Sequence, residues 1–180
     1  MKLSAENYIP QVIVKDLRKR AITAWTVGFS VVFVWVFVLL LAPVAAASNL
    51  QSISNPVYSF FSYLCHQMPE RSFHLENHAF AVCSRCFGVY FGLFAGFIGY
   101  LFFRSVEETE PLPRFWLFAS LVPISIDWSL GVFGIWQNTH WSRFVTGTIL
   151  GVACAVFIIP AIVELAQLLS RKNTTKKAVE

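Results

Sequence analysis

Four long apolar stretches dominate the chain and determine the fold we expect. They run over about 21–41, 81–103, 115–136 and 144–169. Each is long enough for a helix that crosses the hydrocarbon core of a bilayer, which takes about 20 residues. None alternates apolar and polar residues as a strand does. Helices satisfy their own backbone hydrogen bonds in lipid, so the pattern predicts an all-α, integral membrane four-helix bundle.

The composition supports a membrane protein. Of the 180 residues, 56% are hydrophobic and 13% are charged, with a mean hydropathy of +0.60. Soluble domains carry roughly a quarter charged residues, so disordered, collagen-like and nucleic-acid-coating proteins are excluded. We expect a single transmembrane domain over 21–170, between an N-terminal segment (1–20) and a basic tail (171–180).

Basic residues fall mostly on one side of the predicted spans. Eleven of the fourteen Lys and Arg residues precede the first span, separate the second from the third, or follow the fourth. Only Arg71, Arg85 and Arg143 fall on the other side. Because Lys and Arg are retained in the cytoplasm, we expect both termini, the N-terminal segment and the basic tail there. The net charge of +4 then reflects topology, and we expect no nucleic-acid partner.

The N-terminal part also has features of a signal peptide. Basic residues and an apolar run precede Ala45, Ala46 and Ala47, small residues of the kind found at a cleavage site. The run is longer than a usual signal core and is rich in Phe and Trp. We therefore favour a retained first span, with cleavage as the alternative.

The segment between the first two spans, 48–78, contains a short predicted helix. Asn55 and Pro56 are typical of a helix start. Apolar residues follow at the spacing of one helical face: Val57, Phe60, Phe61 and Leu64. We expect an amphipathic helix on the outer membrane surface.

Small residues recur at intervals of four in two of the spans. The second span has Gly88, Gly92 and Gly96, and the fourth has Gly147 and Gly151. Such stripes let two helix backbones approach closely. We expect them to pack within one molecule; a homo-oligomer through either stripe is the alternative.

Cysteines and histidines gather on the outer side. Cys83 and Cys86 share one helix face at the start of the second span, and Cys65 and His66 lie on the segment upstream. Three cysteines and one histidine form a recognised zinc ligand set, and copper or iron also accepts these ligands. We therefore predict a zinc-like metal site at Cys65, His66, Cys83 and Cys86. Three alternatives to His66 remain: His78, His140 or a water molecule.

Four charged residues lie in or near the outer half of the predicted bundle: Asp127, Arg85, Arg71 and Arg143. Charges inside a membrane are costly and mark functional sites by default. Arg85 and Asp127 lie at compatible depths, so we expect them to pair. We interpret all four as candidate catalytic or anion-holding residues, and a purely structural ion pair is the alternative for Arg85 and Asp127.

Two strings carry a family resemblance. CHQMPERSF spans 65–73 and CSRCFGVYFG spans 83–92, and an intramembrane Asp and RFVTGTILG follow them. Over roughly 58–155 the chain resembles the predicted membrane protein family called domain of unknown function 2085. The resemblance implies that the Cys-His segment and the Cys-rich helix start form one unit. It implies no activity or substrate.

The outer-side residues admit three functions. A metal site with four protein ligands would be structural. A site with a bound water would be hydrolytic, with Asp127 or Glu70 as the base, and the arginines would hold an anionic group such as a lipid headgroup. An outward Cys-x-x-Cys also suits a thiol–disulfide oxidoreductase coupled to quinone, although a second shuttle pair is missing. An ion or small-solute transporter is the third reading. Each places a multi-pass protein in the cell membrane, in contact with the lipid bilayer, with its site on the extracytoplasmic side.

Overall fold

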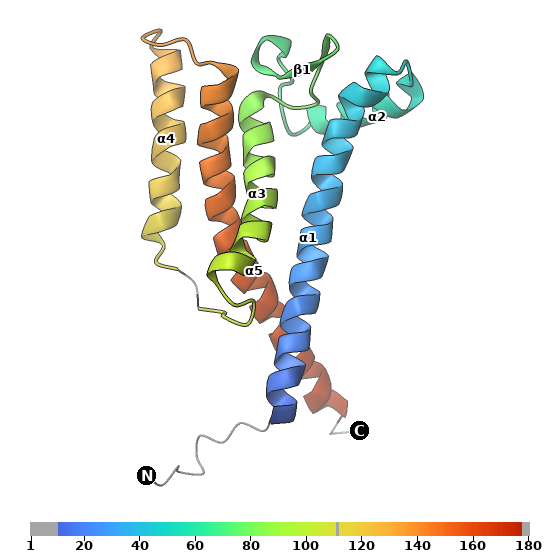
Figure 1. Cartoon of the computed structure of the whole chain (residues 1–180), viewed down its shortest axis with the longest axis vertical. Coiled ribbons are helices and arrows are strands. Elements are labelled where there is room, and N and C mark those ends of the chain that lie inside the picture. The colour runs from blue at the N-terminus through green and yellow to red at the C-terminus, as the bar shows by residue number, and fades with distance from the viewer. Residues whose placement is uncertain (1–10, 111, 178–180) are drawn as a thin grey trace.

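The computed structural model describes residues 11–110 and 112–177, and it is almost entirely helical (Figure 1). In chain order its elements are α1 (Gln11–Ala47), α2 (Gln51–Ser62), the 3-10 helix η2 (Pro69–Arg71), β1 (His74–Leu75), β2 (His78–Ala79), α3 (Ser84–Phe103), α4 (Phe115–Val132) and α5 (His140–Lys177). The two strands form a small antiparallel ribbon, with His74 opposite Ala79.

Four of these helices are long and apolar enough to cross a membrane, as predicted. They cover Val14–Ala47, Ser84–Phe103, Phe115–Val132 and His140–Leu169. Large apolar side chains are exposed along them, including Phe33, Phe37, Phe102 and Trp116. Contiguous apolar surface of this kind requires an apolar environment around the bundle, which a bilayer supplies.

The first helix is longer than the apolar run that predicted it. It continues past Pro43, whose side chain is fully buried, and ends in a motif centred on Asn49. Asn49 adopts a left-handed conformation with φ 58°, and its N–H donates to the carbonyl of Ala46 at 3.0 Å. The N–H of Leu50 donates to Ala45 at 2.8 Å, so the last carbonyls of α1 are satisfied as in a Schellman cap.

The short helix after α1 begins earlier than predicted. Its first residue is Gln51 rather than Asn55, because the carbonyl of Leu50 already accepts the N–H groups of Ile53 and Ser54. The expected apolar face is only partly used. Phe61 is fully buried, whereas Phe60 is half exposed.

Helices α3 and α5 run parallel and pack more closely than any ordinary side chain would allow. A Cβ atom at Gly88 would collide with the carbonyl oxygen of Phe144, and one at Gly92 with that of Thr148. The contact is reciprocal, because a Cβ atom at Gly151 of α5 would collide with the carbonyl oxygen of Val89 in α3. The predicted packing of the two stripes within one molecule is confirmed, and α3 and α5 therefore begin at the same end of the bundle (Figure 1).

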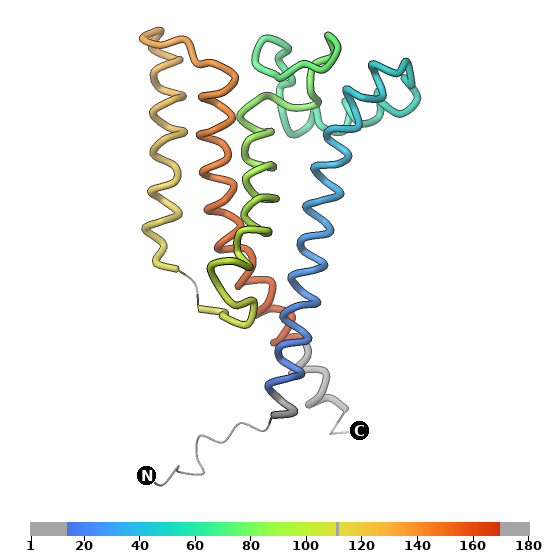
Figure 2. The backbone as a smooth tube through the Cα atoms, viewed as in Figure 1, coloured from blue at the N-terminus to red at the C-terminus, as the bar shows by residue number. Residues whose placement is uncertain are grey.

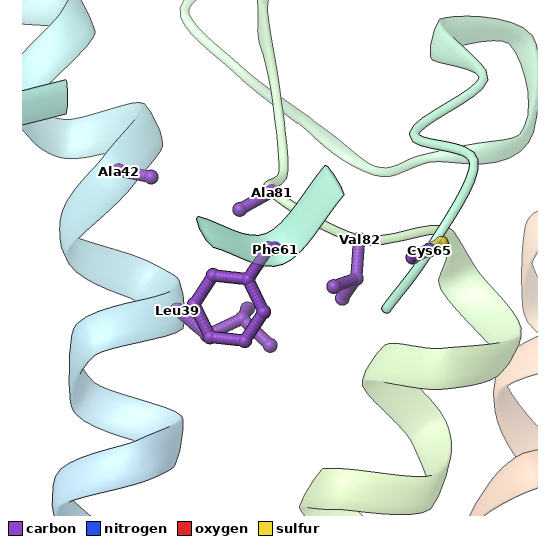
Figure 3. Close-up of a cluster of buried hydrophobic side chains, with 6 residues drawn as sticks. All are labelled: Leu39, Ala42, Phe61, Cys65, Ala81 and Val82. Carbon is purple, nitrogen blue, oxygen red and sulfur yellow. The ribbon is translucent and has the colours of Figure 1, made fainter. Parts of the chain in front are cut away.

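The chain between α2 and α3 lies at this same end, beside the last turns of α1 (Figure 2). A buried apolar cluster holds the pieces together: Leu39, Ala42, Phe61, Cys65, Ala81 and Val82 (Figure 3). Since its members come from α1, α2 and the connection to α3, the cluster fixes that connection over the start of α3. We call the end where α3 and α5 begin the cysteine end of the bundle.

Candidate metal centre

Three cysteine sulfurs meet at the cysteine end. Cys65 follows the end of α2, Cys83 is the N-cap of α3, and Cys86 lies in the first turn of that helix. The three Sγ atoms all lie within 4.8 Å of one another. A group of this kind can hold one metal ion. Its members come from two segments, and the whole η2 and β1–β2 region lies between those segments in the sequence.

Backbone contacts hold Cys65 over the start of α3. Its N–H donates to the carbonyl of Phe61 at 2.9 Å, and its Sγ accepts the N–H of Cys83 at 3.2 Å. The side chain of Cys65 is only 8% exposed and belongs to the buried apolar cluster of Figure 3. Its sulfur is therefore fixed in place by both packing and hydrogen bonding.

Two further side chains, which the sequence did not single out, position this segment. The amide of Gln67 donates to the carbonyls of Tyr58 at 2.7 Å and Ala81 at 2.8 Å, and so ties α2 to the segment before α3. The hydroxyl of Tyr58 donates to the carbonyl of Ala79 at 2.5 Å. Burial raises the pKa of Tyr58, which keeps this hydroxyl a donor. The only sequence signal for Gln67 was its place within the CHQMPERSF string.

The surroundings of Cys65 favour a thiolate. Hydrogen bonds from the thiols of Cys83 and Cys86, and from the backbone N–H groups of Cys83 and Gln67, lower the pKa of Cys65 to about 2 against the opposing effect of burial. The thiolate is the form of cysteine that binds metals and attacks disulfides.

Histidine does not complete the cluster. Among the described residues, the group that can hold a metal contains the three cysteines and not His66, His78 or His140. His66 is exposed, because the chain after α2 is non-helical and turns Cys65 inward and its neighbour outward. The Nδ1 atom of His140 instead lies 3.0 Å from Oγ of Ser84. Of the predicted ligand set, the structure therefore brings together Cys65, Cys83 and Cys86 and leaves His66 outside that group.

The predicted meeting of Arg85 and Asp127 is confirmed. Nη2 of Arg85 lies 2.5 Å from Oδ2 of Asp127, and the two side chains are 24% and 8% exposed. Asn138, which the sequence did not mark, donates its amide to the same oxygen at 3.0 Å and also to the backbone carbonyl of Asp127. The carboxylate on α4 is therefore held by α3 and by the chain that leads into α5.

The other candidates occupy the same end. Arg71 closes η2 and is exposed, as is Glu70, whereas Arg143 is half-buried in the first turn of α5. The charges of Arg71, Arg85 and Asp127 all act on Arg143, together with Cys83. Cys154 lies further along α5 as a half-buried free thiol, apart from the three-cysteine group.

Comparison with known proteins identifies relatives. A family model described as predicted membrane protein (DUF2085) matches residues 65–157. An uncharacterised protein of Methanocaldococcus jannaschii is 35% identical over 113 residues, which cover 63% of this chain and 72% of that protein. Another, from Methanothermobacter thermautotrophicus, is 38% identical over 96 residues, 53% of this chain and 85% of its own length. No solved structure matches the chain significantly. The matched region begins at Cys65 and includes the whole cysteine group, and the chain belongs to the DUF2085 family of predicted membrane proteins.

Proposed function

We propose that this protein is a multi-pass protein of the cell membrane with a zinc-like metal centre formed by Cys65, Cys83 and Cys86. The observation that carries the proposal is the proximity of three sulfurs from two separate segments, all within 4.8 Å. Zinc–sulfur bonds of about 2.3 Å bring ligand sulfurs to roughly 3.5–4 Å from each other. Only a small contraction of the group is then needed. Iron and copper(I) suit the same ligands.

We assign the centre a structural role first. A metal ion would link the segment after α2 to the start of α3, where Gln67 and the apolar cluster already join them. With three protein ligands, the fourth position of a tetrahedral ion goes to water or an exogenous group, as in hydrolytic zinc sites, but hydrolysis would also need a base. The carboxylate of Asp127 is engaged by Arg85 and Asn138, which favours an ion-pair role over that of a hydrolytic base.

We place the cysteine end on the extracytoplasmic side. The asymmetry of eleven Lys and Arg residues against three supports this orientation, with both termini in the cytoplasm. Helix α2 would then lie at the outer membrane surface, where its exposed Ile53 and Phe60 contact lipid.

The same three sulfurs favour one second candidate, thiol–disulfide exchange. In this reaction two of the three thiols, Cys65 among them as the thiolate, would form a disulfide and pass two electrons and two protons to a quinone in the membrane. In that case a reversible disulfide would take the place of the metal.

Metal analysis of the purified protein decides between these two. We expect one zinc ion per chain in protein purified in neutral detergent without chelator, and loss of that zinc in Cys65→Ser, Cys83→Ser and Cys86→Ser. Cys154→Ser is the matched control, because Cys154 lies outside the group, and it should retain the metal. A metal-free wild type in which two of the four thiols resist alkylation until reduced would contradict the metal centre and support the redox alternative.

A further inference from the structure

Three arginines lie at the cysteine end of the bundle. Arg85 lies in the first turn of α3, Arg143 in the first turn of α5, and Arg71 closes η2. The charges of Arg71, Arg85 and Asp127 all act on Arg143, so these four groups share one electrostatic neighbourhood. A zinc ion held by three thiolates carries a net charge of about −1. The three arginines exceed that charge and Asp127 by one positive charge, before Glu70, which is exposed beside Arg71, is counted.

Only one of the arginines has a carboxylate partner. Arg85 is paired with Asp127 at 2.5 Å. In the part of the chain that the structure describes, neither Arg71 nor Arg143 has a carboxylate within 4.0 Å, although Glu70 precedes Arg71 in sequence. Like charges repel more strongly near a low-dielectric membrane interior than in water. A bound anion would offset this repulsion.

Arg85 also has a donor without a partner. Its Nη2 holds Asp127, but its Nε is buried and has no hydrogen-bond acceptor among the described residues. A buried donor left unpaired is unfavourable, and an oxygen of a bound ligand would satisfy it.

The helix geometry adds to the positive potential. Because Gly88 packs on the carbonyl of Phe144, α3 and α5 run side by side and both begin here. The start of a helix carries a partial positive charge that favours anions, although in α5 the N–H of Ser142 already donates to Oγ1 of Thr139. At the junction of the two starts, Ser84 and His140 lie 3.0 Å apart and add polar groups.

We propose that Arg71, Arg85 and Arg143 bind a phosphate-class anion at the paired starts of α3 and α5. The planar guanidinium fork matches phosphate oxygens with two parallel hydrogen bonds. The site lies at one end of the membrane-spanning helices, the depth at which lipid headgroups sit. The anion is therefore either the phosphodiester of an anionic phospholipid or a free phosphate. This binding site does not depend on the metal centre.

Two assays on the full-length protein in neutral detergent distinguish the two sources. Isothermal titration with inorganic phosphate tests the free anion, and native mass spectrometry after incubation with phosphatidylglycerol tests the lipid. The variants are Arg71→Gln and Arg143→Gln, which leave the Arg85–Asp127 pair intact. Arg114→Gln, just before α4 at the opposite end of the bundle, removes the same charge and is the control.

We expect the wild type to bind one of the two probes, and Arg114→Gln to bind the same probe with equal affinity. Arg71→Gln and Arg143→Gln should bind it at least about tenfold more weakly, the effect of losing a charge-assisted hydrogen bond. Weakened phosphate titration would identify free phosphate, and loss of retained lipid without phosphate binding would identify the headgroup. Failure of the wild type to bind either probe, or equal binding by Arg143→Gln and Arg114→Gln, would overturn the proposal. Unfolding midpoints of the variants close to wild type would show that weakened binding is not a loss of fold.

Discussion

At the scale of single residues, the neighbours of Cys65 determine its chemistry. Two thiols and two backbone N–H groups surround its sulfur and outweigh burial, which alone would raise the pKa. The residue next to it, His66, is exposed and lies outside the three-cysteine group. Adjacent residues in one motif thus lie in different environments, which spacing along the sequence cannot reveal.

The lowered pKa of Cys65 predicts a pH dependence of stability in the metal-free protein. Folding lowers this pKa from its ordinary value of 9.0 to about 2. The resulting stabilisation is fully present above pH 9 and is lost progressively as the pH falls toward 2. After chelation, the wild type should therefore unfold at lower denaturant concentration at pH 5 than at pH 8.

Variants test whether Cys65 is the source of that dependence. Cys65→Ser should show a smaller difference between the two unfolding midpoints, while Cys154→Ser should keep the difference of the wild type. An unchanged pH dependence in Cys65→Ser would show that the thiol is not a thiolate in the folded protein.

The ion pair between Arg85 and Asp127 predicts a second effect at this scale. Replacing Arg85 by Met leaves the buried carboxylate without its charge partner, which should lower the free energy of unfolding by about 3 kcal/mol. The double variant Arg85→Met, Asp127→Leu removes both charges and should be more stable than the single variant. Denaturant titration of the three proteins measures this, and a double variant less stable than Arg85→Met would show that the two side chains do not depend on each other.

At the scale of helices, the close packing of α3 on α5 is the most sensitive feature. A methyl group at Gly92 would collide with the carbonyl oxygen of Thr148, whereas one at Gly99 would meet nothing within 4 Å. We expect Gly92→Ala to destabilise the protein by about 1–3 kcal/mol, the usual cost of overpacking. Gly99→Ala, on the same helix, should be neutral or slightly stabilising. Equal effects of the two substitutions in thermal unfolding would contradict the parallel packing.

The hydrophobic pattern was sufficient to predict the four helices that are long and apolar enough to cross a membrane. The glycine spacing was sufficient to predict which two of them pack together. The start of α2 was placed at Asn55 instead of Gln51, because Leu50 forms the first turn with its backbone carbonyl and this leaves no mark in the sequence. Gln67 and Asn138 were missed for a similar reason. Their amides bond to backbone carbonyls or to Asp127 across long loops, contacts that only the folded chain brings together.

At the scale of the whole molecule, the orientation of the bundle decides which side of the membrane the cysteine group faces. One end of the bundle carries the cysteine group and α2, together with Arg71, Arg85 and Arg143. The other end carries basic residues near the start of α1, namely Lys15, Arg18 and Lys19. If basic residues are retained in the cytoplasm, the cysteine end faces outward.

Reporter fusions test this orientation. After Lys177, we expect a reporter that works only in the cytoplasm to be active and one that works only outside it to be inactive. At Asn49, between α1 and α2, we expect the reverse. A fusion after Lys177 exported from the cytoplasm would place the cysteines on the inner side and contradict the proposed topology.

X-ray absorption spectroscopy of the purified wild-type protein at the zinc edge tests the three-cysteine metal centre, because it reports the identity, number and distance of the atoms bound to the metal. We predict three sulfur neighbours at about 2.3 Å and one lighter neighbour at about 2.0 Å. The Cys86→Ser variant, if it retains any metal, should show fewer sulfur neighbours. A spectrum with only nitrogen and oxygen neighbours, or protein whose cysteines are joined in a disulfide with no metal present, would contradict the metal centre.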